Sequence, residues 1–195
     1  LLPKRLPEAE HVLVVPEPVD DVPKGMELRV VTPSRPRRRT FVGFDHWETS
    51  DLADVITDIG ADLYFTPYPT PPVKSDVPVA MVVHDMIPWQ LSEYRASLRS
   101  RIQLRRKLRG IRKASQLLTV SKTAKRAITD VAGVPARRIA GTYDGVDGRY
   151  RKRPAAAAVS RVKKRHGLVR PYVLYLGGYD ARKNVRVLVE GFALE

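Results

Sequence analysis

The sequence predicts an α/β protein built on doubly wound parallel sheets. Short apolar runs, typical of strands that are covered on both faces, alternate with segments whose apolar residues recur at helical spacing. Because helical segments separate most of these runs, the strands that the runs form should be parallel. The predicted strands are residues 11–15, 28–32, 62–66, 79–83, 116–120, 138–142 and 172–176.

Capping residues mark the ends of the predicted helices. Ser121 and Asn184 suit N-caps, whereas Gly60, Gly133 and Gly167 suit the positions just past helix C-termini. The predicted helices are residues 47–59, 92–113, 121–132, 155–166 and a last one that begins after residue 184. The predicted loops include a basic one at residues 33–40 and a proline-rich one at residues 66–78.

A turn-rich connector at residues 143–154 predicts a domain boundary, and Asp144-Gly145 is its sharpest turn signal. We expect a partial N-terminal domain over residues 1–147 and the start of a second domain over residues 148–195. The chain begins without methionine and stops soon after its last helix has begun, so we expect it to be a fragment.

The composition favours a polyanionic partner. The formal net charge is +14, from 35 basic and 21 acidic side chains, which predicts attraction to nucleic acid, anionic lipid or phosphorylated substrates without choosing among them. The chain has no cysteine, which excludes disulfides and thiol chemistry and is compatible with a cytoplasmic protein. No apolar run approaches the roughly 18 residues that a membrane-spanning helix needs.

Residues 172–192, YVLYLGGYDARKNVRVLVEGF, predict a strand, a glycine turn and a helix. Gly177 and Gly178 allow the backbone to approach a ligand closely. Arg182 and Lys183 lie beside the predicted helix N-terminus, where free N–H groups and the helix dipole favour an anion. A phosphate or diphosphate is the predicted ligand, although the residue types alone fit an ordinary turn with solvated cations equally well.

His84 and Asp85 come directly after the predicted strand 79–83. Ligands of open α/β sheets bind outside the carboxyl ends of the strands, so this position favours function. A histidine and a carboxylate there could hydrogen-bond a sugar hydroxyl or handle a proton. On residue types alone, a pair that merely caps the strand is the better interpretation.

The predicted helix 92–113 is basic and amphipathic. Its apolar stripe consists of Leu98, Ile102, Leu108 and Ile111, and its other faces carry nine Lys and Arg side chains. Such a helix can lie on an anionic membrane surface or bind nucleic acid. The alternative is a solvated charged face on a helix that packs on the core.

Four motifs in a fixed order carry a family resemblance. The segments VVHDMIP, LLTVSKTAKRAI, GVD and LGGYDARKNVRVLVEGF resemble those of retaining glycosyltransferases of the GT-B fold, family 4. The resemblance implies two Rossmann-like domains and transfer of a sugar from a nucleotide-sugar donor to an acceptor hydroxyl with retained configuration. It also implies a role in polysaccharide or glycolipid biosynthesis, with a saccharide or lipid-linked acceptor.

The same resemblance assigns roles to particular residues. It places His84 beside the transferred sugar and leaves the role of its neighbour Asp85 open. Gly177, Gly178 and the cations Arg182 and Lys183 would hold the donor diphosphate. It implies a hexosyltransferase that needs no bound metal and no cofactor, the nucleotide-sugar being the substrate. A cytoplasmic location, with a peripheral position at the inner face of the membrane through helix 92–113, is the expected setting.

The sequence also departs from the family pattern. Gly178 stands where the family often has a phosphate-binding arginine, and neither the N-terminal glycine-rich loop nor the later segment with two glutamates is present. We therefore expect the 195 residues to be inactive alone. Two alternatives remain open: a basic α/β module that binds nucleic acid through helix 92–113, and a non-catalytic GT-B subunit.

Overall fold

The computed structural model describes residues 2–34 and 46–193, so the predicted basic loop 33–40 lies almost wholly outside the described residues. The chain divides into two compact units, Leu1–Asp144 and Gly145–Glu195.

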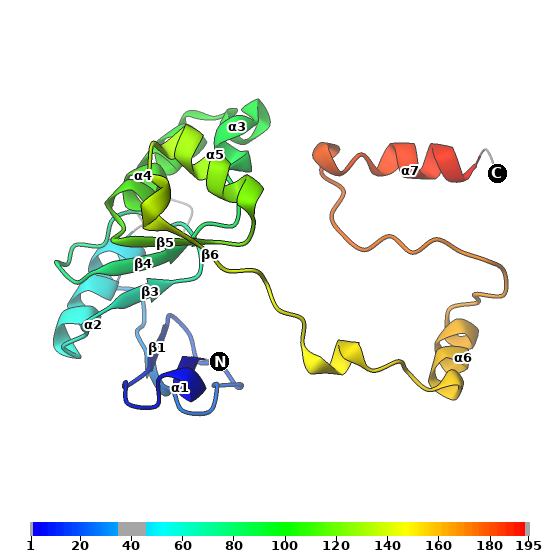
Figure 1. The fold of residues 1–195 in the computed structure, drawn as a ribbon, viewed down its shortest axis with the longest axis horizontal. Coiled ribbons are helices and arrows are strands. Elements are labelled where there is room, and N and C mark those ends of the chain that lie inside the picture. Colours follow the sequence, from blue (N-terminus) through cyan, green and yellow to red (C-terminus); the bar gives the residue numbers. More distant parts are fainter. Residues whose placement is uncertain (1, 35–45, 194–195) are drawn as a thin grey trace. The chain divides into compact units, whose positions relative to one another are not determined.

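The first unit opens with a short helix and a small parallel sheet (Figure 1). Helix α1 (Leu2–Arg5) precedes strands β1 (Val12–Val15) and β2 (Glu27–Val30), which pair in parallel from Val12 opposite Glu27 to Val15 opposite Val30. These strands confirm the apolar runs predicted at residues 11–15 and 28–32, the second beginning one residue earlier.

A second, four-stranded sheet forms the centre of the first unit. Its strands are β3 (Tyr64–Thr66), β4 (Val79–Val82), β5 (Gln116–Thr119) and β6 (Ile139–Gly141), paired in parallel in the order β3-β4-β5-β6. The spatial order of the strands is their order in the sequence. Because all pairs are parallel, the carboxyl ends of the four strands lie at one edge. Helices α4 (Leu98–Lys113) and α5 (Lys122–Ala132) connect these strands and lie on the same face of the sheet, as successive right-handed crossovers require (Figure 1).

The main core lies between this sheet and helices α4 and α5. Apolar side chains from the strands, from both helices and from the loops between them are no more than 2% exposed there. They are Met81, Val83, Met86, Ile111, Ala114, Leu117, Ile128, Ala132, Val134 and Ile139. Ser121 caps α5 as predicted, because its hydroxyl accepts a hydrogen bond from the Ala124 N–H, and Gly133 ends the helix at φ 68°. The predicted α/β class with parallel sheets is confirmed.

The predicted single helix 92–113 is wrong at its start. Residues Ser92–Arg95 form a separate 3-10 turn, η2, and α4 begins only at Leu98. The break occurs because Ser97 is extended, at φ −105° and ψ 154°, and exchanges capping hydrogen bonds with Ser100. A serine that can cap competes with helix continuation, so the helix restarts after it.

Two other helical segments differ in detail from the prediction. The predicted helix 47–59 begins as a π-helical turn, η1 (Trp47–Asp51), and continues as α2 (Leu52–Asp58). A short helix that was not predicted, α3 (Ile87–Gln90), follows the fourth strand run, with a proline in its first turn.

The second unit contains helical segments and an extended chain. Its elements are the 3-10 turn η4 (Gly148–Arg151), α6 (Ala156–Arg165), the 3-10 turn η5 (Ala181–Lys183) and α7 (Val185–Phe192). The predicted strand 172–176 is wrong: these residues belong to no strand, and Leu174 and Leu176 are 79% and 94% exposed. A strand exists only through hydrogen bonds to a neighbour, and the described part of this unit offers no second strand to pair with.

Asn184 occupies the N-cap position of α7, but not in the predicted way. Its backbone is left-handed, at φ 47° and ψ 43°, and its side chain makes no capping hydrogen bond. Asparagine tolerates this conformation better than most residues. The residue therefore serves as the bend between η5 and α7.

Candidate functional site

The turn that follows β4 presents His84 at the carboxyl edge of the four-stranded sheet. Val83, which precedes it, is fully buried, and its N–H donates to the Leu118 carbonyl at 2.8 Å. The Val83 carbonyl accepts a hydrogen bond of 2.7 Å from the buried Thr119 hydroxyl. The backbone before His84 is thus fixed to β5, the neighbouring strand, on both its donor and its acceptor side.

The residues after His84 are fixed as well. The Asp85 carboxylate accepts a hydrogen bond of 2.9 Å from the Ile87 N–H, which begins α3, and Met86 is 1% exposed in the core. On α3, the Trp89 indole N–H donates to the Leu104 carbonyl of α4 at 3.1 Å. Asp85 therefore has a structural use for one of its two carboxylate oxygens.

The His84 side chain is exposed, as Asp85 is, but unlike Asp85 it has no hydrogen bond or ion pair among the described residues. Its two ring nitrogens can accept or donate a hydrogen bond to a ligand. A side chain that a rigid backbone presents at a sheet edge, without a hydrogen-bond partner among the described residues, is well placed to meet a small molecule.

The other predicted site residues lie together in the second unit. Gly177 and Gly178 form a turn in which the Tyr175 hydroxyl donates to the Gly178 carbonyl at 2.7 Å. A Cβ at Gly177 would lie 2.8 Å from that hydroxyl oxygen, which is the far end of a flexible side chain, so a larger residue here would displace the tyrosine and its hydrogen bond.

Arg182 and Lys183 belong to η5, immediately before α7. The turn is closed by the Lys183 N–H, which donates to the Asp180 carbonyl at 2.8 Å. The Arg182 guanidinium forms an ion pair with the Asp180 carboxylate, with 3.6 Å between the nearest nitrogen and oxygen. An anion that binds to Arg182 must therefore compete with Asp180, whereas Lys183 is exposed.

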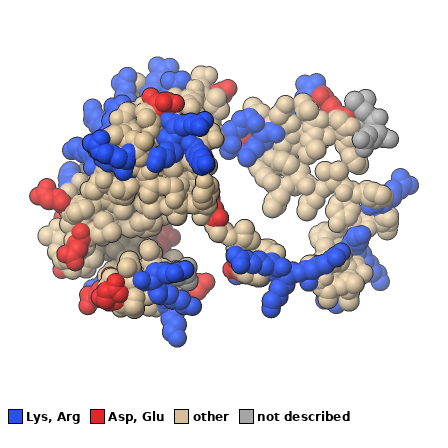
Figure 2. Space-filling model, in the orientation of Figure 1, with Lys and Arg blue, Asp and Glu red and all other residues tan. Residues whose placement is uncertain are grey.

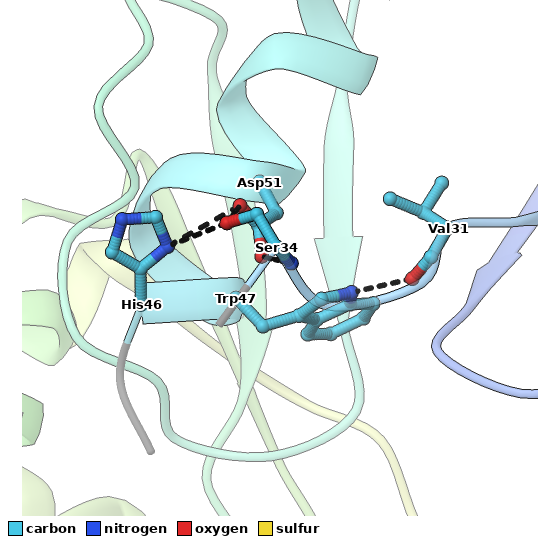
Figure 3. Close-up of polar contacts among 5 residues, drawn as sticks. All are labelled: Val31, Ser34, His46, Trp47 and Asp51. Carbon is cyan, nitrogen blue, oxygen red and sulfur yellow. Dashed lines mark hydrogen bonds and ion pairs between the residues drawn. The ribbon is translucent and has the colours of Figure 1, made fainter. Parts of the chain in front are cut away.

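A polar cluster that the sequence interpretation missed joins residue 34 to η1 (Figure 3). Asp51 accepts hydrogen bonds from the Ser34 hydroxyl at 2.6 Å and from the Ser34 N–H at 3.0 Å, and His46 Nδ1 lies 3.2 Å from the same carboxylate. Nearby, the Trp47 indole N–H donates to the Val31 carbonyl at 3.0 Å. No local sequence signal marks this cluster, because its members come together only through tertiary structure.

The cluster has the electrostatics of a structural tie. Burial raises the pKa of Asp51, but the hydrogen bonds from Ser34 and the nearby His46 outweigh burial and leave the pKa below its ordinary value. Both the Ser34 hydroxyl and the Ser34 N–H donate to this one carboxylate, so Asp51 fixes the backbone and the side chain of residue 34 together. The arrangement holds the chain after β2 against η1.

Residues 2–34 and 46–193 contain neither a metal cluster nor a membrane-spanning helix. No three His, Asp or Glu side chains in these ranges gather closely enough to hold a metal ion. No helix in the same ranges is long and apolar enough to cross a membrane.

The fold and the His84 turn together define an α/β protein of the Rossmann-like type, with a candidate ligand position at the carboxyl edge of a parallel sheet. Comparison with known families makes the class specific. The model of Glycosyltransferase Family 4 matches residues 3–149, and the chain belongs to this family. No curated protein matches the chain. The matched range contains His84 and Asp85, whereas Gly177, Gly178, Arg182 and Lys183 lie beyond it.

Proposed function

We propose that this protein transfers a hexosyl group from a nucleotide-sugar donor to an acceptor hydroxyl with retention of configuration, in polysaccharide or glycolipid assembly. The observation that carries the proposal is the position of His84 in a family 4 domain. Its backbone is fixed on both sides and its imidazole is exposed at the carboxyl edge of the sheet. In this role the imidazole hydrogen-bonds a hydroxyl of the transferred sugar.

Asp85 supports this role by positioning. Its carboxylate holds the Ile87 N–H and so sets the direction of the chain after His84. The proposal therefore separates two functions within one dipeptide: His84 contacts the sugar, and Asp85 keeps the turn in place.

Gly177, Gly178, Arg182 and Lys183 are proposed to hold the donor diphosphate. Negative charge builds on the leaving diphosphate as the bond to the sugar breaks, and cations and N–H groups aimed at that charge lower the barrier. Lys183 is exposed and is the last residue of η5, directly before the bend at Asn184. It forms no ion pair among the described residues, so it can bind a phosphate without breaking one. Arg182 would exchange Asp180 for the diphosphate.

Titration calorimetry with a panel of nucleotide-sugars tests the donor role. We expect saturable binding to one donor, and about tenfold weaker binding, or about 1.4 kcal/mol, in Lys183→Ala. Lys164→Ala is the matched control, because it removes the same charge from an exposed position on α6 in the same unit. Equal losses of affinity in both variants would mean that the effect comes from the net charge and not from a contact of Lys183 with the diphosphate.

Transfer assays on the intact parent protein test the two functions at the sheet edge. His84→Ala should lower the transfer rate without changing the unfolding midpoint. Asp85→Asn keeps an oxygen that can accept from the Ile87 N–H, so it should retain activity, whereas Asp85→Ala should lose stability and activity together. A large loss of activity in a stable Asp85→Asn variant would instead give the carboxylate charge a role in catalysis.

A second candidate function is binding of a polyanionic surface, either a membrane or nucleic acid, through α4. This helix has eight Lys and Arg residues and no acidic residue over 16 positions. Figure 2 shows many basic side chains over the region where Figure 1 labels α3, α4 and α5. Such a helix suits the anionic inner face of a membrane, where a cytoplasmic enzyme with a lipid-linked acceptor would work. Failure of all donors to bind, together with tight and salt-sensitive binding of nucleic acid, would favour a nucleic-acid module instead.

A further inference from the structure

An apolar groove with a basic rim lies where α3, η2, α4 and α5 meet. Its volume is about 520 Å³, within the usual range for small-molecule sites. Its residues come from α3, η2, α4 and α5, and none of them is acidic. They are Trp89, Ser92, Arg95, Arg101, Leu104, Arg105, Leu108 and Val131.

The helix α4 contributes a regular stripe to this groove. Arg101, Leu104, Arg105 and Leu108 stand at i, i+3, i+4 and i+7, so they lie on one face of the helix and alternate between cation and leucine. Arg101 and Arg105 repel each other at this spacing, and no acidic residue of α4 offsets the repulsion. The stripe therefore favours an occupant that supplies both an apolar surface and a negative charge.

Hydrogen bonds fix the geometry of the groove. The Trp89 indole N–H donates to the Leu104 carbonyl, which holds α3 against α4. The Arg101 Nε donates to the Arg95 carbonyl at 2.9 Å, which ties the rim of α4 to η2. Trp89, Leu108 and Val131 also pack against the main core, so the apolar walls are anchored from behind.

We propose that this groove binds a single-chain lipid phosphate, an alkyl or isoprenyl chain with a phosphate head. The chain lies on Trp89, Leu104 and Leu108, and the phosphate meets the arginines of the rim. Guanidinium groups bind phosphate through parallel charge-assisted hydrogen bonds, which matches the head group. The proposal rests on the proposed function in one respect: it makes such a lipid the carrier of the sugar acceptor.

Nucleic acid fits the groove less well than a lipid phosphate does. Its phosphates would satisfy the arginines, but its backbone offers no apolar chain for the leucines, and Trp89 is held by its own hydrogen bond. Binding of a lipid phosphate therefore requires apolar and basic contacts together, and an experiment can test each kind of contact separately.

The test is titration of the whole chain with dodecyl phosphate below its micelle concentration, followed by calorimetry and tryptophan emission. Trp89 lines the groove, whereas the other tryptophan, Trp47, is 6% exposed, so a change of emission reports mainly on the groove. We expect saturable one-to-one binding. Inorganic phosphate and a dodecyl glucoside, which carry only the charge or only the chain, should bind at least tenfold more weakly.

Matched variants locate the site. Arg105→Ala should weaken binding of dodecyl phosphate roughly tenfold, as expected for loss of a charge-assisted contact, and Leu104→Gln should weaken it by a similar factor. Arg109→Ala and Leu98→Gln are the controls, because they make the same changes at exposed positions of α4 outside the groove. Circular dichroism confirms that each variant is folded.

Three outcomes would overturn the proposal. They are binding of inorganic phosphate or glucoside as tightly as dodecyl phosphate, equal losses in the groove variants and their controls, and binding that depends on Arg105 but not on Leu104. Because no donor is present, the result is independent of transfer. Binding of dodecyl phosphate by a protein that binds no nucleotide-sugar would uphold the groove and refute only the acceptor role of the lipid.

Discussion

Replacement of Gly110 by alanine should destabilise the first unit, although alanine is the better helix former. Gly110 lies inside α4 and is buried against the proline-rich loop between β3 and β4. A Cβ there would lie 1.9 Å from the Thr70 carbonyl oxygen and 3.2 Å from the Pro71 carbonyl carbon. Both neighbours are backbone atoms of fully buried residues, so neither can rotate away.

The sign of the effect follows from two opposing contributions. Glycine to alanine in a helix interior gains about 1 kcal/mol from helix propensity. Overpacking that shifts backbone in a packed core costs about 1–3 kcal/mol, and a contact far below van der Waals distance lies at or above the upper end. We therefore expect a net loss of about 2 kcal/mol of unfolding free energy, or a fall of roughly 4–8 °C in the melting temperature.

Urea and thermal unfolding, followed by circular dichroism, measure this effect. Gly141→Ala is the control, because Gly141 ends β6 in the same unit and a Cβ there would meet no atom within 4 Å. The control should change stability by no more than about 0.5 kcal/mol. An unchanged or raised stability in Gly110→Ala would refute the close packing of residues 70–71 on α4.

Three further substitutions test contacts around the sheet. Thr119→Val leaves the buried Val83 carbonyl without its donor and should cost about 1–3 kcal/mol in urea unfolding. Ser121→Ala removes the cap of α5 and should cost about 1 kcal/mol, with a measurable loss of helical ellipticity on heating. The pKa of Asp51 is lowered in the folded state, so its contribution to stability is complete above the ordinary value of 3.8 and is lost as the pH falls through the lower folded value. Asp51→Asn should therefore reduce stability at pH 7 and flatten the acid limb of the stability profile below pH 4. If the acid limb of Asp51→Asn is as steep as that of the wild type, the loss of stability in acid does not come from protonation of Asp51.

The elements of the first unit were predictable where local pattern and tertiary packing agree. Strands buried on both faces give continuous apolar runs, so residues 79–83 and 116–120 could be located within a residue of β4 and β5. The N-cap of α5 was also predictable, because Ser121 and its partner lie three residues apart. Such signals are contained in a few consecutive residues.

The errors arose where a segment depends on a distant partner or on local competition. Residues 172–176 have a strand composition but lack a neighbouring strand in the described chain, so they remain without ladder hydrogen bonds. The start of α4 was misplaced because Ser92 and Ser97 both suit an N-cap, and only the second makes the hydrogen bonds. Composition does not decide between two equivalent caps.

The candidate sites, too, were predictable where the signal is local and not where it depends on distant residues. The place of His84 followed from the strand that precedes it, because the end of a buried strand can be read from sequence. The Ser34–Asp51 contact spans 17 residues, and the groove needs Val131 of α5 opposite Trp89 of α3. No spacing rule brings such residues together. The basic and apolar stripes of α4 were visible in sequence, but not the walls that turn them into a groove.

The turn after β4 separates the residues that build the fold from the one that is left for a ligand. Val83 uses both backbone groups to join β5, Asp85 uses its carboxylate to start α3, and Met86 is buried in the core. Replacement of any of these residues should cost stability, whereas the exposed His84 side chain forms no hydrogen bond or ion pair with the described residues. Stability therefore gives no reason for an imidazole at this position, and the reason is best sought in a ligand. The rigid neighbours hold the backbone of His84 at one place on the sheet edge, which limits where the imidazole can reach, as hydrogen bonding to a bound sugar requires.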